Sequence, residues 1–316
     1  MEYRIAPSTL ACNLVNNSLY EPDYFMNMAS FQALACPLDG DPLTQAEGAW
    51  RCPAGHSFDI AKQGYVNLLP VQKKRSNDPG DSKIMVAARQ RFLNAGYYQP
   101  IAEALNHAAL NGVPENMPLS CLDAGCGEGY YLRKLAQAAP DTALLELIGL
   151  DISKWAVMAA AKQSRQQEPN RQQEQSVTWV VGSNANLPVQ TASLDRLLCM
   201  FGFPVMSEFS RVLKPGGALL QVEAGANHLR ELREIIYPTL KPERSGEQAV
   251  PEGFAAQAAE TVGYSLTLNG KEAIADLLAM TPHLYRASAE GRERAAALKT
   301  LIVSVDVRVI KWIKNA

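Results

Sequence analysis

Residues 122–130 read Leu122-Asp123-Ala124-Gly125-Cys126-Gly127-Glu128-Gly129-Tyr130, and the fold class follows from this stretch. A short apolar run, Leu119 to Leu122, leads into it, and a helical pattern, Tyr130 to Ala139, leaves it. Glycine lets the backbone turn sharply and approach a ligand with no side chain in the way. A strand, a glycine turn and a helix form the nucleotide-cradling unit of a doubly wound sheet. The stretch therefore predicts an α/β fold with a Rossmann-like sheet.

Two acidic residues stand where consecutive strands are expected to end. Asp123 ends the first strand, and Asp151 follows the next apolar run, Leu144 to Leu150. The spacing Gly-x-Gly-x-Gly, which begins at Gly125, does not require a pyrophosphate, and Asp123 suits a ligand with a positive amino group, such as S-adenosylmethionine (SAM). An acid at the end of the second strand commonly binds ribose hydroxyls. The alternative is an ordinary tight turn with a surface aspartate, which leaves the agreement of these features unexplained.

The alternation of strands and helices continues along the chain. The further strands that we expect are Val177–Val181, Leu194–Met200, Ala218–Val222, Tyr264–Leu268 and a run with Val303, Val305, Val307 and Val309 on one face. The alternation of valines with other residues in the last run has the period of two that marks a strand with distinct faces. The loop after Val181 contains Asn184 and Ala185, which would lie beside the adenine of a bound SAM.

Composition narrows the class of protein. The chain has 316 residues, 47% of them hydrophobic, yet nothing approaches the apolar run of about 18 residues that a membrane span needs. Its first 30 residues lack the pattern of a secretory signal, and its six cysteines suggest a reducing compartment, the cytoplasm. A net charge of −2 argues against a generally basic, nucleic-acid-coating protein. Only a local basic patch, Lys73-Lys74-Arg75, is a candidate for binding nucleic acid. The alternative is that these residues are solvated charges in a linker.

The composition along the chain predicts four segments. Residues 1–30 form an N-terminal extension without a clear pattern, and residues 31–70 form a small module rich in Gly, Pro and Cys. Residues 71–110 contain a linker and a helical stretch, and residues 111–316 form the main domain.

The small module contains the residues of a candidate metal site. A zinc ribbon places two ligands on each of two turns. Cys36, Cys52 and His56 have workable spacing, and Asp39 stands at the fourth position. A carboxylate binds zinc, although a thiolate is the softer ligand, and an aspartate before a glycine also stabilises a turn. Three interpretations stay open: a zinc site with two Cys, one His and one Asp, a weakened and partly filled site, and a metal-free ribbon.

Motifs outside the glycine stretch resemble one family. The segment from Cys52-Pro53 through His56, Phe58-Asp59 and Gly64-Tyr65-Val66-Asn67-Leu68-Leu69-Pro70 to Asp78-Pro79-Gly80-Asp81 is similar to the bacterial 23S rRNA guanine-N1 methyltransferases of the RlmA type. The resemblance continues through Ala95-Gly96, Tyr98-Gln99-Pro100, His228-Leu229 and Met280-Thr281-Pro282, and it covers about residues 34–316. The Leu213-Lys214-Pro215-Gly216-Gly217 turn also resembles class I SAM-dependent methyltransferases.

The resemblance implies a class I methyltransferase sheet, a bound SAM, a zinc ribbon, a 23S rRNA hairpin as substrate and a homodimer. Asp39 stands where the family usually has its second Cys, so the metal is the part of the resemblance that this chain alters. For SAM, the resemblance implies Tyr98 as a ring packed on the cofactor, Gly127 as room for it, Glu128 at its polar end and His228 closing over the methionine. Without the resemblance, His228 would read as a solvent-facing residue before a helix.

The expected chemistry is in-line methyl transfer from a sulfonium, catalysed mainly by positioning. Guanine N1 carries a proton that some group must take, and the sequence does not identify this base. Phe201 and Phe203, after the fourth strand, would stack an unstacked base; core packing is the alternative. That loop lacks the Asn/Asp-Pro-Pro-aromatic motif of amine methylation, which favours a ring nitrogen. The ribbon and Lys73-Lys74-Arg75 would hold the hairpin backbone.

Other functions are compatible with parts of the sequence. One alternative is a SAM-dependent methyltransferase of a small molecule, which the near-neutral charge favours. Another is a noncatalytic SAM-binding or interaction protein, against which the intact Asp123, Gly125, Gly127 and Asp151 speak. A nicotinamide dehydrogenase is disfavoured by the glycine spacing.

Overall fold

The computed structural model describes residues 33–73, 76, 78–113, 117–140, 142–167, 177–240 and 249–316. All of them belong to one unit of the chain. The predicted N-terminal extension at residues 1–30 lies outside the described residues, and so do Lys74, Arg75 and the side chain of Lys73.

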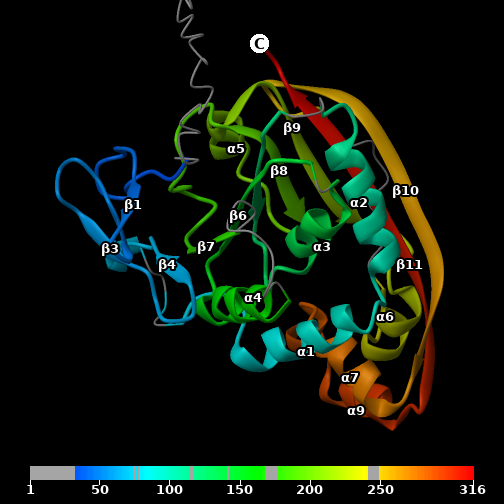
Figure 1. Ribbon diagram of the computed structural model, residues 1–316. Helices are drawn as coiled ribbons and strands as arrows, with labels where there is room; N and C mark the ends of the chain where they lie inside the picture. Colours follow the sequence, from blue (N-terminus) through cyan, green and yellow to red (C-terminus); the bar gives the residue numbers. More distant parts are fainter. Residues whose placement is uncertain are drawn as a thin grey trace, which may run out of the picture. The chain divides into compact units, whose positions relative to one another are not determined.

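An eight-stranded sheet forms the centre of the described chain, in the order β10-β11-β9-β8-β5-β6-β7-β4 (Figure 1). Its strands are β4 (Tyr65–Asn67), β5 (Leu119–Ala124), β6 (Leu145–Asp151), β7 (Thr178–Val181), β8 (Leu194–Met200), β9 (Leu213–Ala224), β10 (Phe254–Asn269) and β11 (Thr300–Lys314). The strands from β4 to β9 pair in parallel, while β11 is antiparallel to β9 and β10. The order reverses beside β5, which neighbours both β6 and β8, and such switch points are where open α/β sheets bind ligands.

The predicted fold class is confirmed, because this is the α/β sheet expected of a class I methyltransferase. All six residues of β5 are buried, as in a parallel sheet covered on both faces. The Leu-Lys-Pro-Gly-Gly turn forms an irregularity between two paired strands: Leu213 lies opposite Leu194, but Ala218 already lies opposite Arg196. Gly216 has a φ of 76° in that excursion, a conformation that favours glycine.

The predicted C-terminal hairpin is present and longer than expected. Val305 lies opposite Tyr264, and Val303 lies opposite Leu266. The valines of β11 at positions 303, 305, 307 and 309 are buried, in accordance with their period of two.

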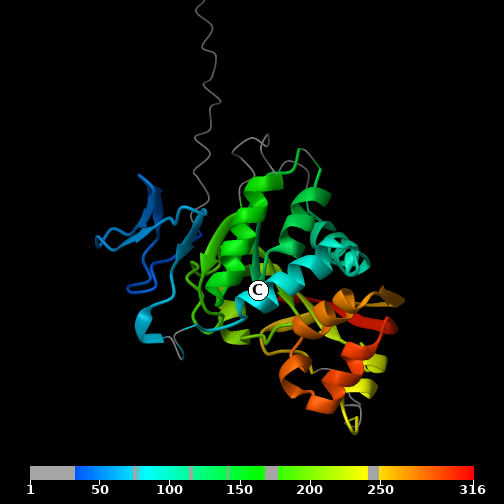
Figure 2. The same ribbon diagram turned by 90° about the horizontal axis from the view of Figure 1, so that it is seen from below.

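Helices lie on both sides of the sheet and beyond one of its ends. They are α1 (Lys83–Asn94), α2 (Gln99–Leu110), α3 (Tyr130–Ala138), α4 (Lys154–Gln167), α5 (Met206–Val212), α6 (Arg230–Ile236), α7 (Lys271–Ala279), α8 (His283–Arg286) and α9 (Ala289–Ala297), with a short 3-10 turn at Val71–Lys73. The Ser82 hydroxyl caps α1 by accepting a hydrogen bond from the Met85 N–H at 3.4 Å. Helices α1, α7 and α9 gather below the sheet (Figures 1 and 2), and α1 packs against α7 and α4. Within the described residues, no helix has the length and apolarity that crossing a membrane requires.

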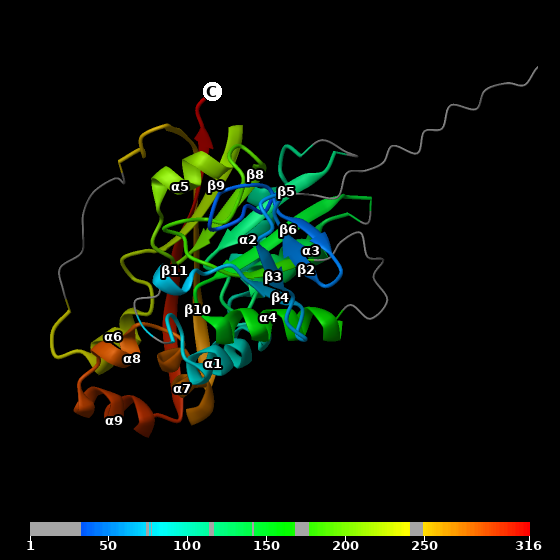
Figure 3. The ribbon, with the colours of Figure 1, turned by 90° about the vertical axis from the view of Figure 1, so that its left-hand side faces the viewer.

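The N-terminal module is a separate, three-stranded antiparallel sheet of β1 (Thr44–Ala46), β2 (Ala49–Arg51) and β3 (Ser57–Asp59). It is attached to the rest of the chain at two places. Just after it, β4 pairs in parallel with β7, and just before it, Leu34 forms a bridge with Val189 in the loop between β7 and β8. Figure 3, in which the module faces the viewer, shows it in front of the main sheet and above α4. The small module is therefore bound both to the edge of the sheet and to the loop that follows β7.

Candidate functional site

The glycine turn after β5 is held in place by the neighbouring strand β6. Gly125, Gly127 and Gly129 all have positive φ angles, of 95°, 56° and 80°. The Gly125 N–H donates to the Leu150 carbonyl at 2.8 Å, and the Gly127 N–H donates to Asp151 Oδ2 at 2.9 Å. The turn therefore depends on glycine for its backbone and on Asp151 for its position.

Asp123 is a buried acid without a partner. Its side chain is 0% exposed, and neither carboxylate oxygen has a hydrogen-bond partner in the described part of the chain. Burial raises the pKa of Asp123 to about 8, and the Asp151 carboxylate adds to the shift. An unpaired buried carboxylate is costly, so this position calls for a ligand that brings donors or positive charge.

The Asp151 carboxylate accepts hydrogen bonds from two backbone N–H groups. Besides the Gly127 N–H, it accepts a hydrogen bond at Oδ1 from the Ser153 N–H at 2.8 Å. Burial raises the pKa of Asp151, although these two hydrogen bonds oppose the shift. Each carboxylate oxygen still has a lone pair that a ligand hydroxyl could use.

The loop after β7 reaches the glycine turn. The Asn184 side-chain amide donates to the Ala124 carbonyl at 3.3 Å, and Ala185 is exposed beside it. The structure thus brings Asp123, Asp151 and Asn184 to one end of β5.

The Glu128 side chain points into the protein, toward α3 and α4. It is 1% exposed, and its carboxylate pairs with Arg133 at 2.8 Å and also accepts a hydrogen bond from the Gln163 amide. Arg133 lies on α3 and Gln163 on α4, so Glu128 ties the glycine turn to both helices. Neither Arg133 nor Gln163 was expected at the site from the sequence; the available signal was a charged and a polar side chain among the apolar positions of these helices.

The segment predicted as part of a linker packs on the residues that follow β6. The Ser153 hydroxyl donates to the Asp81 carbonyl at 2.7 Å, and the Trp155 indole N–H donates to Asp78 at 2.7 Å. Asp81 also pairs with Arg89 of α1, and the Arg89 guanidinium lies 3.5 Å from the position of a Cβ on Gly127. The glycine turn is thus covered from outside the sheet by Arg89, whose place at this turn was not expected from the sequence.

Tyr98, His228 and Phe201 form a cluster at the carboxyl ends of β8 and β9. The Tyr98 hydroxyl lies 3.3 Å from His228 Nε2. The Phe201 ring stacks on His228 with 5.7 Å between ring centroids and lies 6.1 Å from the Tyr98 ring. The structure therefore brings together two predicted cofactor residues and one predicted substrate residue.

His228 is buried rather than facing solvent. The Asp306 N–H donates to its Nδ1 at 3.3 Å. Burial lowers the pKa of His228 to about 4, although the Asp306 carboxylate acts in the opposite direction. The ring is consequently neutral at physiological pH.

Neither phenylalanine after β8 belongs to the core. Phe203 is 89% exposed and Phe201 is 40% exposed. Phe201 also has a φ of 53°, an unusual conformation for a bulky residue, which often marks a functional position. Their exposure is inconsistent with the core-packing alternative.

The four predicted metal ligands converge in the small module. The donor atoms of Cys36, Asp39, Cys52 and His56 all lie within 4.8 Å of one another. His56 Nδ1 is 2.8 Å from Asp39 Oδ2 and 3.3 Å from the Cys52 sulfur. Burial raises the pKa of the Cys36 thiol, while the Asp41 N–H and the Cys36 thiol hold the pKa of Asp39 below its usual range. Two thiols, an imidazole and a carboxylate at these distances fit a tetrahedral zinc ion.

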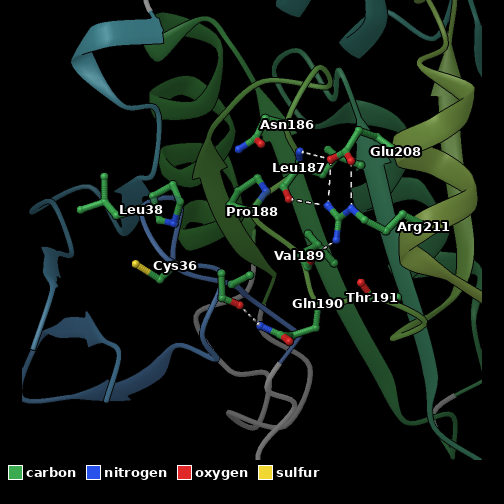
Figure 4. Close-up of a pocket in the computed structure, with 13 residues that line it drawn as sticks. Cys36, Leu38, Asn186, Leu187, Pro188, Val189, Gln190, Thr191, Glu208 and Arg211 are labelled. Carbon is green, nitrogen blue, oxygen red and sulfur yellow. Dashed lines mark hydrogen bonds and ion pairs between the residues drawn. The ribbon is translucent and has the colours of Figure 1, made fainter. Parts of the chain in front are cut away.

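A cavity of about 430 Å³ lies between this cluster and the loop before β8 (Figure 4). On one side lie Cys36 and Leu38, and on the other Glu208 and Arg211 bind the loop by hydrogen bonds. Arg211 donates to the Leu187 and Val189 carbonyls at 2.9 and 2.7 Å. The Gln190 amide, in the loop before β8, donates to the Gly40 carbonyl of the small module at 3.0 Å. The cluster of Cys36, Asp39, Cys52 and His56 is therefore connected through Gly40 to the segment that continues from the Asn184 loop.

Comparisons with known proteins agree with this arrangement. A family model described as the N-terminal zinc ribbon of RlmA matches residues 34–77, and a methyltransferase-domain model matches residues 121–217. A Streptomyces fradiae 23S rRNA (guanine(748)-N(1))-methyltransferase is 33% identical, with 79% of this chain and 84% of that protein covered. A Micromonospora griseorubida protein named for 23S rRNA (guanine-N(1)) methylation is 35% identical, with 88% of this chain and 96% of that protein covered. Bacillus subtilis YxjB, named for the same reaction, is 29% identical, with 90% and 98% covered.

Proposed function

The chain belongs to the 23S rRNA (guanine-N1)-methyltransferase family, and we propose that it transfers the SAM methyl group to N1 of a guanine in a 23S rRNA hairpin. The observation that carries the cofactor part is the unpaired, buried carboxylate of Asp123 at the end of β5. SAM has an ammonium group that would neutralise it, whereas a cofactor that brings only phosphate would not.

The residues around Asp123 would hold the rest of the cofactor. Asp151 would bind ribose hydroxyls with its remaining lone pairs, and Asn184 and Ala185 would lie beside the adenine. Gly125 and Gly127 would leave room for the chain of the cofactor because neither carries a side chain. This arrangement agrees with the position of the site at the switch point beside β5.

Three further predicted cofactor residues would act in different ways. Tyr98 and His228 would lie against the methionine end, where their side chains already contact each other at 3.3 Å. Glu128 would hold the glycine turn in place for the cofactor, because its carboxylate binds Arg133 and Gln163 and its backbone forms part of the turn.

The acceptor base would be held by the exposed aromatic residues after β8. Every base has a flat face that stacks on an aromatic ring, and sequence-specific RNA recognition targets unstacked bases. Phe201 is next to the cofactor residues Tyr98 and His228, and Phe203 is the more exposed of the two rings. We therefore assign base stacking to Phe201 and Phe203.

Most of the catalysis would come from positioning, because the sulfonium is already an activated leaving group. The electron pair released when N1 loses its proton would form the bond to the methyl carbon, while the electrons of the carbon–sulfur bond would move to sulfur. The N1 proton has to leave, and no side chain is assigned as its acceptor.

The small module would bind zinc and contact RNA. Cys36, Asp39, Cys52 and His56 would hold the metal, whose contribution would be to fix the two turns of the ribbon. Lys73, Lys74 and Arg75, just after the module, would contact the phosphates of the hairpin. A homodimer and a cytoplasmic location, where rRNA is available, complete the proposal.

The test is methyl transfer from labelled SAM to 23S rRNA lacking this modification, with the product nucleoside identified by mass spectrometry. The expected product is 1-methylguanosine at one hairpin position, together with loss of SAM binding in Asp123→Asn. Tight SAM binding by the wild type without transfer to any rRNA would overturn the RNA part and favour a small-molecule acceptor. Methylation at another atom of guanine would overturn the N1 assignment alone.

A further inference from the structure

The hydrogen bonds around His228 determine the direction of the Tyr98 hydroxyl proton. His228 Nδ1 accepts the Asp306 N–H at 3.3 Å, so the neutral ring carries its proton on Nε2. His228 Nε2 lies 3.3 Å from the Tyr98 oxygen, so Nε2–H donates and the tyrosine oxygen accepts. The proton of Tyr98 is then directed to a different partner, and among the described residues none accepts it.

The Tyr98 hydroxyl lies beside the place assigned to the acceptor base. Phe201, the residue that directly follows β8, stacks on His228 and approaches Tyr98 at 6.1 Å between ring centroids. Phe201 is partly exposed, whereas Tyr98 is 3% exposed. A base that stacks on Phe201, or displaces its ring, therefore comes next to the Tyr98–His228 pair.

A hydrogen-bond donor near O6 of the target guanine would assist methylation at N1. Loss of the N1 proton gives an anion whose charge is shared between N1 and O6. A donor aimed at O6 stabilises that anion, in the way that an oxyanion hole stabilises developing charge. The same donor rejects adenine, which presents an amino group instead of O6 and would place two donors face to face.

We propose that the Tyr98 hydroxyl, held by His228, donates a hydrogen bond to O6 of the target guanine and thereby activates N1. The N1 proton passes to water, the N1 electron pair forms the bond to the methyl carbon, and the carbon–sulfur electrons remain on sulfur. Tyr98 keeps its own proton throughout, and burial raises the pKa of Tyr98, which favours that role. The inference rests on the proposed function and names a specificity residue for it.

The experiment separates this role from a contact with the cofactor. Tyr98→Phe keeps the ring and removes the hydroxyl. SAM Kd is measured by calorimetry, and kcat is measured on the rRNA substrate at saturating SAM from about pH 6 to about pH 10. Tyr285→Phe is the matched control, because its hydroxyl contacts only the Met85 sulfur among the described residues, at 3.1 Å, on the exposed surface of α8.

We expect kcat of Tyr98→Phe to fall about 100-fold, the usual order for loss of one such donor, with SAM Kd changed less than about threefold. Its rate should also rise with pH over a higher range than that of the wild type, since N1 loses its proton less readily. Tyr285→Phe should match the wild type in both measurements. A weaker SAM Kd with kcat restored at saturating SAM would overturn the inference and make the hydroxyl a cofactor contact.

A second substrate tests the partner atom. In rRNA with 6-thioguanosine at the target, sulfur replaces O6 and accepts hydrogen bonds weakly. The ratio of wild-type to Tyr98→Phe rates should then shrink toward one, the non-additivity expected of two groups in contact. An unchanged ratio would overturn the O6 contact. Absence of wild-type methylation on any rRNA would overturn the proposed function and this inference together.

Discussion

The indole of Trp179 occupies the space that a side chain on Gly129 would need. A Cβ on Gly129 would stand 2.3 Å from Trp179 Cη2. Trp179, on β7, is 2% exposed, and its ring also blocks Gly149 of β6, where a Cβ would stand 2.2 Å away. The last glycine of the turn is therefore required by packing within the sheet and by its φ of 80°.

Gly129→Ala should destabilise the protein by about 2–4 kcal/mol, because it combines overpacking of a buried site with a left-handed backbone. Gly127→Ala is the matched control, since its Cβ would meet only the flexible Arg89 side chain, at 3.5 Å. It should lose about 1 kcal/mol of stability and mainly weaken SAM binding. Urea denaturation without cofactor measures both; equal losses for the two variants would contradict the role of Trp179.

The sequence predicted the parts of the fold that obey a local pattern. Apolar runs that end in a glycine or an acidic residue predicted β5 and β6, and the alternating valines predicted β11. The first half of β10 could not be seen in this way, because Ala255 to Thr261 is exposed throughout and shows no alternation of polar and apolar residues.

The candidate site residues could be predicted where the residue type itself indicates a function, such as an acid at a strand end or a Cys/His pair. Contacts between residues that are distant in sequence could not be predicted in this way. Asp123 and Asp151 lie at the ends of neighbouring strands, and the four predicted metal ligands lie close together in the small module. The burial of Glu128 against Gln163 depends on how α4 packs, and Arg89 reaches the glycine turn only because the preceding segment folds back on Ser153. Neither contact follows from spacing along the chain.

Asp123→Asn should change how stability depends on pH. The pKa of Asp123 is raised from 3.8 to about 8 in the folded protein, so between these values the folded state binds more protons than the unfolded state. Stability of the cofactor-free wild type therefore falls as pH rises through this window, by at most about 1.4 kcal/mol per pH unit. The asparagine side chain does not titrate, so Asp123→Asn lacks this contribution to the pH dependence of stability.

The measurement is the free energy of unfolding, without SAM, at several pH values from about 4 to about 9. The difference between Asp123→Asn and wild type should grow in favour of the variant as pH rises to about 8 and then level off. Parallel curves for the two proteins would show that Asp123 is ionised in the folded state at all of these pH values.

The buried pair of Glu128 and Arg133 should be sensitive to loss of one partner. Both side chains are almost fully buried, so Arg133→Met leaves a buried carboxylate without its cation and should cost about 3–5 kcal/mol. Glu128→Gln in the same chain removes the charge and should recover most of that loss. Arg51→Met is the control, because the 52% exposed Arg51 side chain pairs with the 82% exposed Glu47 at the surface and should contribute less than about 1 kcal/mol. Thermal and urea unfolding of the wild type, Arg133→Met, the double variant and the control variant measure these differences. A double variant no more stable than Arg133→Met would contradict the prediction.

Asp39→Cys should strengthen metal binding in the small module. The carboxylate of Asp39 already lies within 3.3 Å of both the Cys52 sulfur and His56 Nδ1, so a shorter thiolate ligand would need only a small shift of the turn. Thiolate is the softer ligand for zinc, so the variant should release zinc to a competing chelator more slowly than wild type, and Asp39→Ala should release it faster. The readout is zinc transfer to a coloured chelator, together with one zinc per chain by elemental analysis. Asp39→Asn serves as the control, because it keeps the turn but offers a neutral, weaker ligand. If Asp39→Ala held zinc as firmly as wild type, Asp39 would be a residue of the turn and not a ligand.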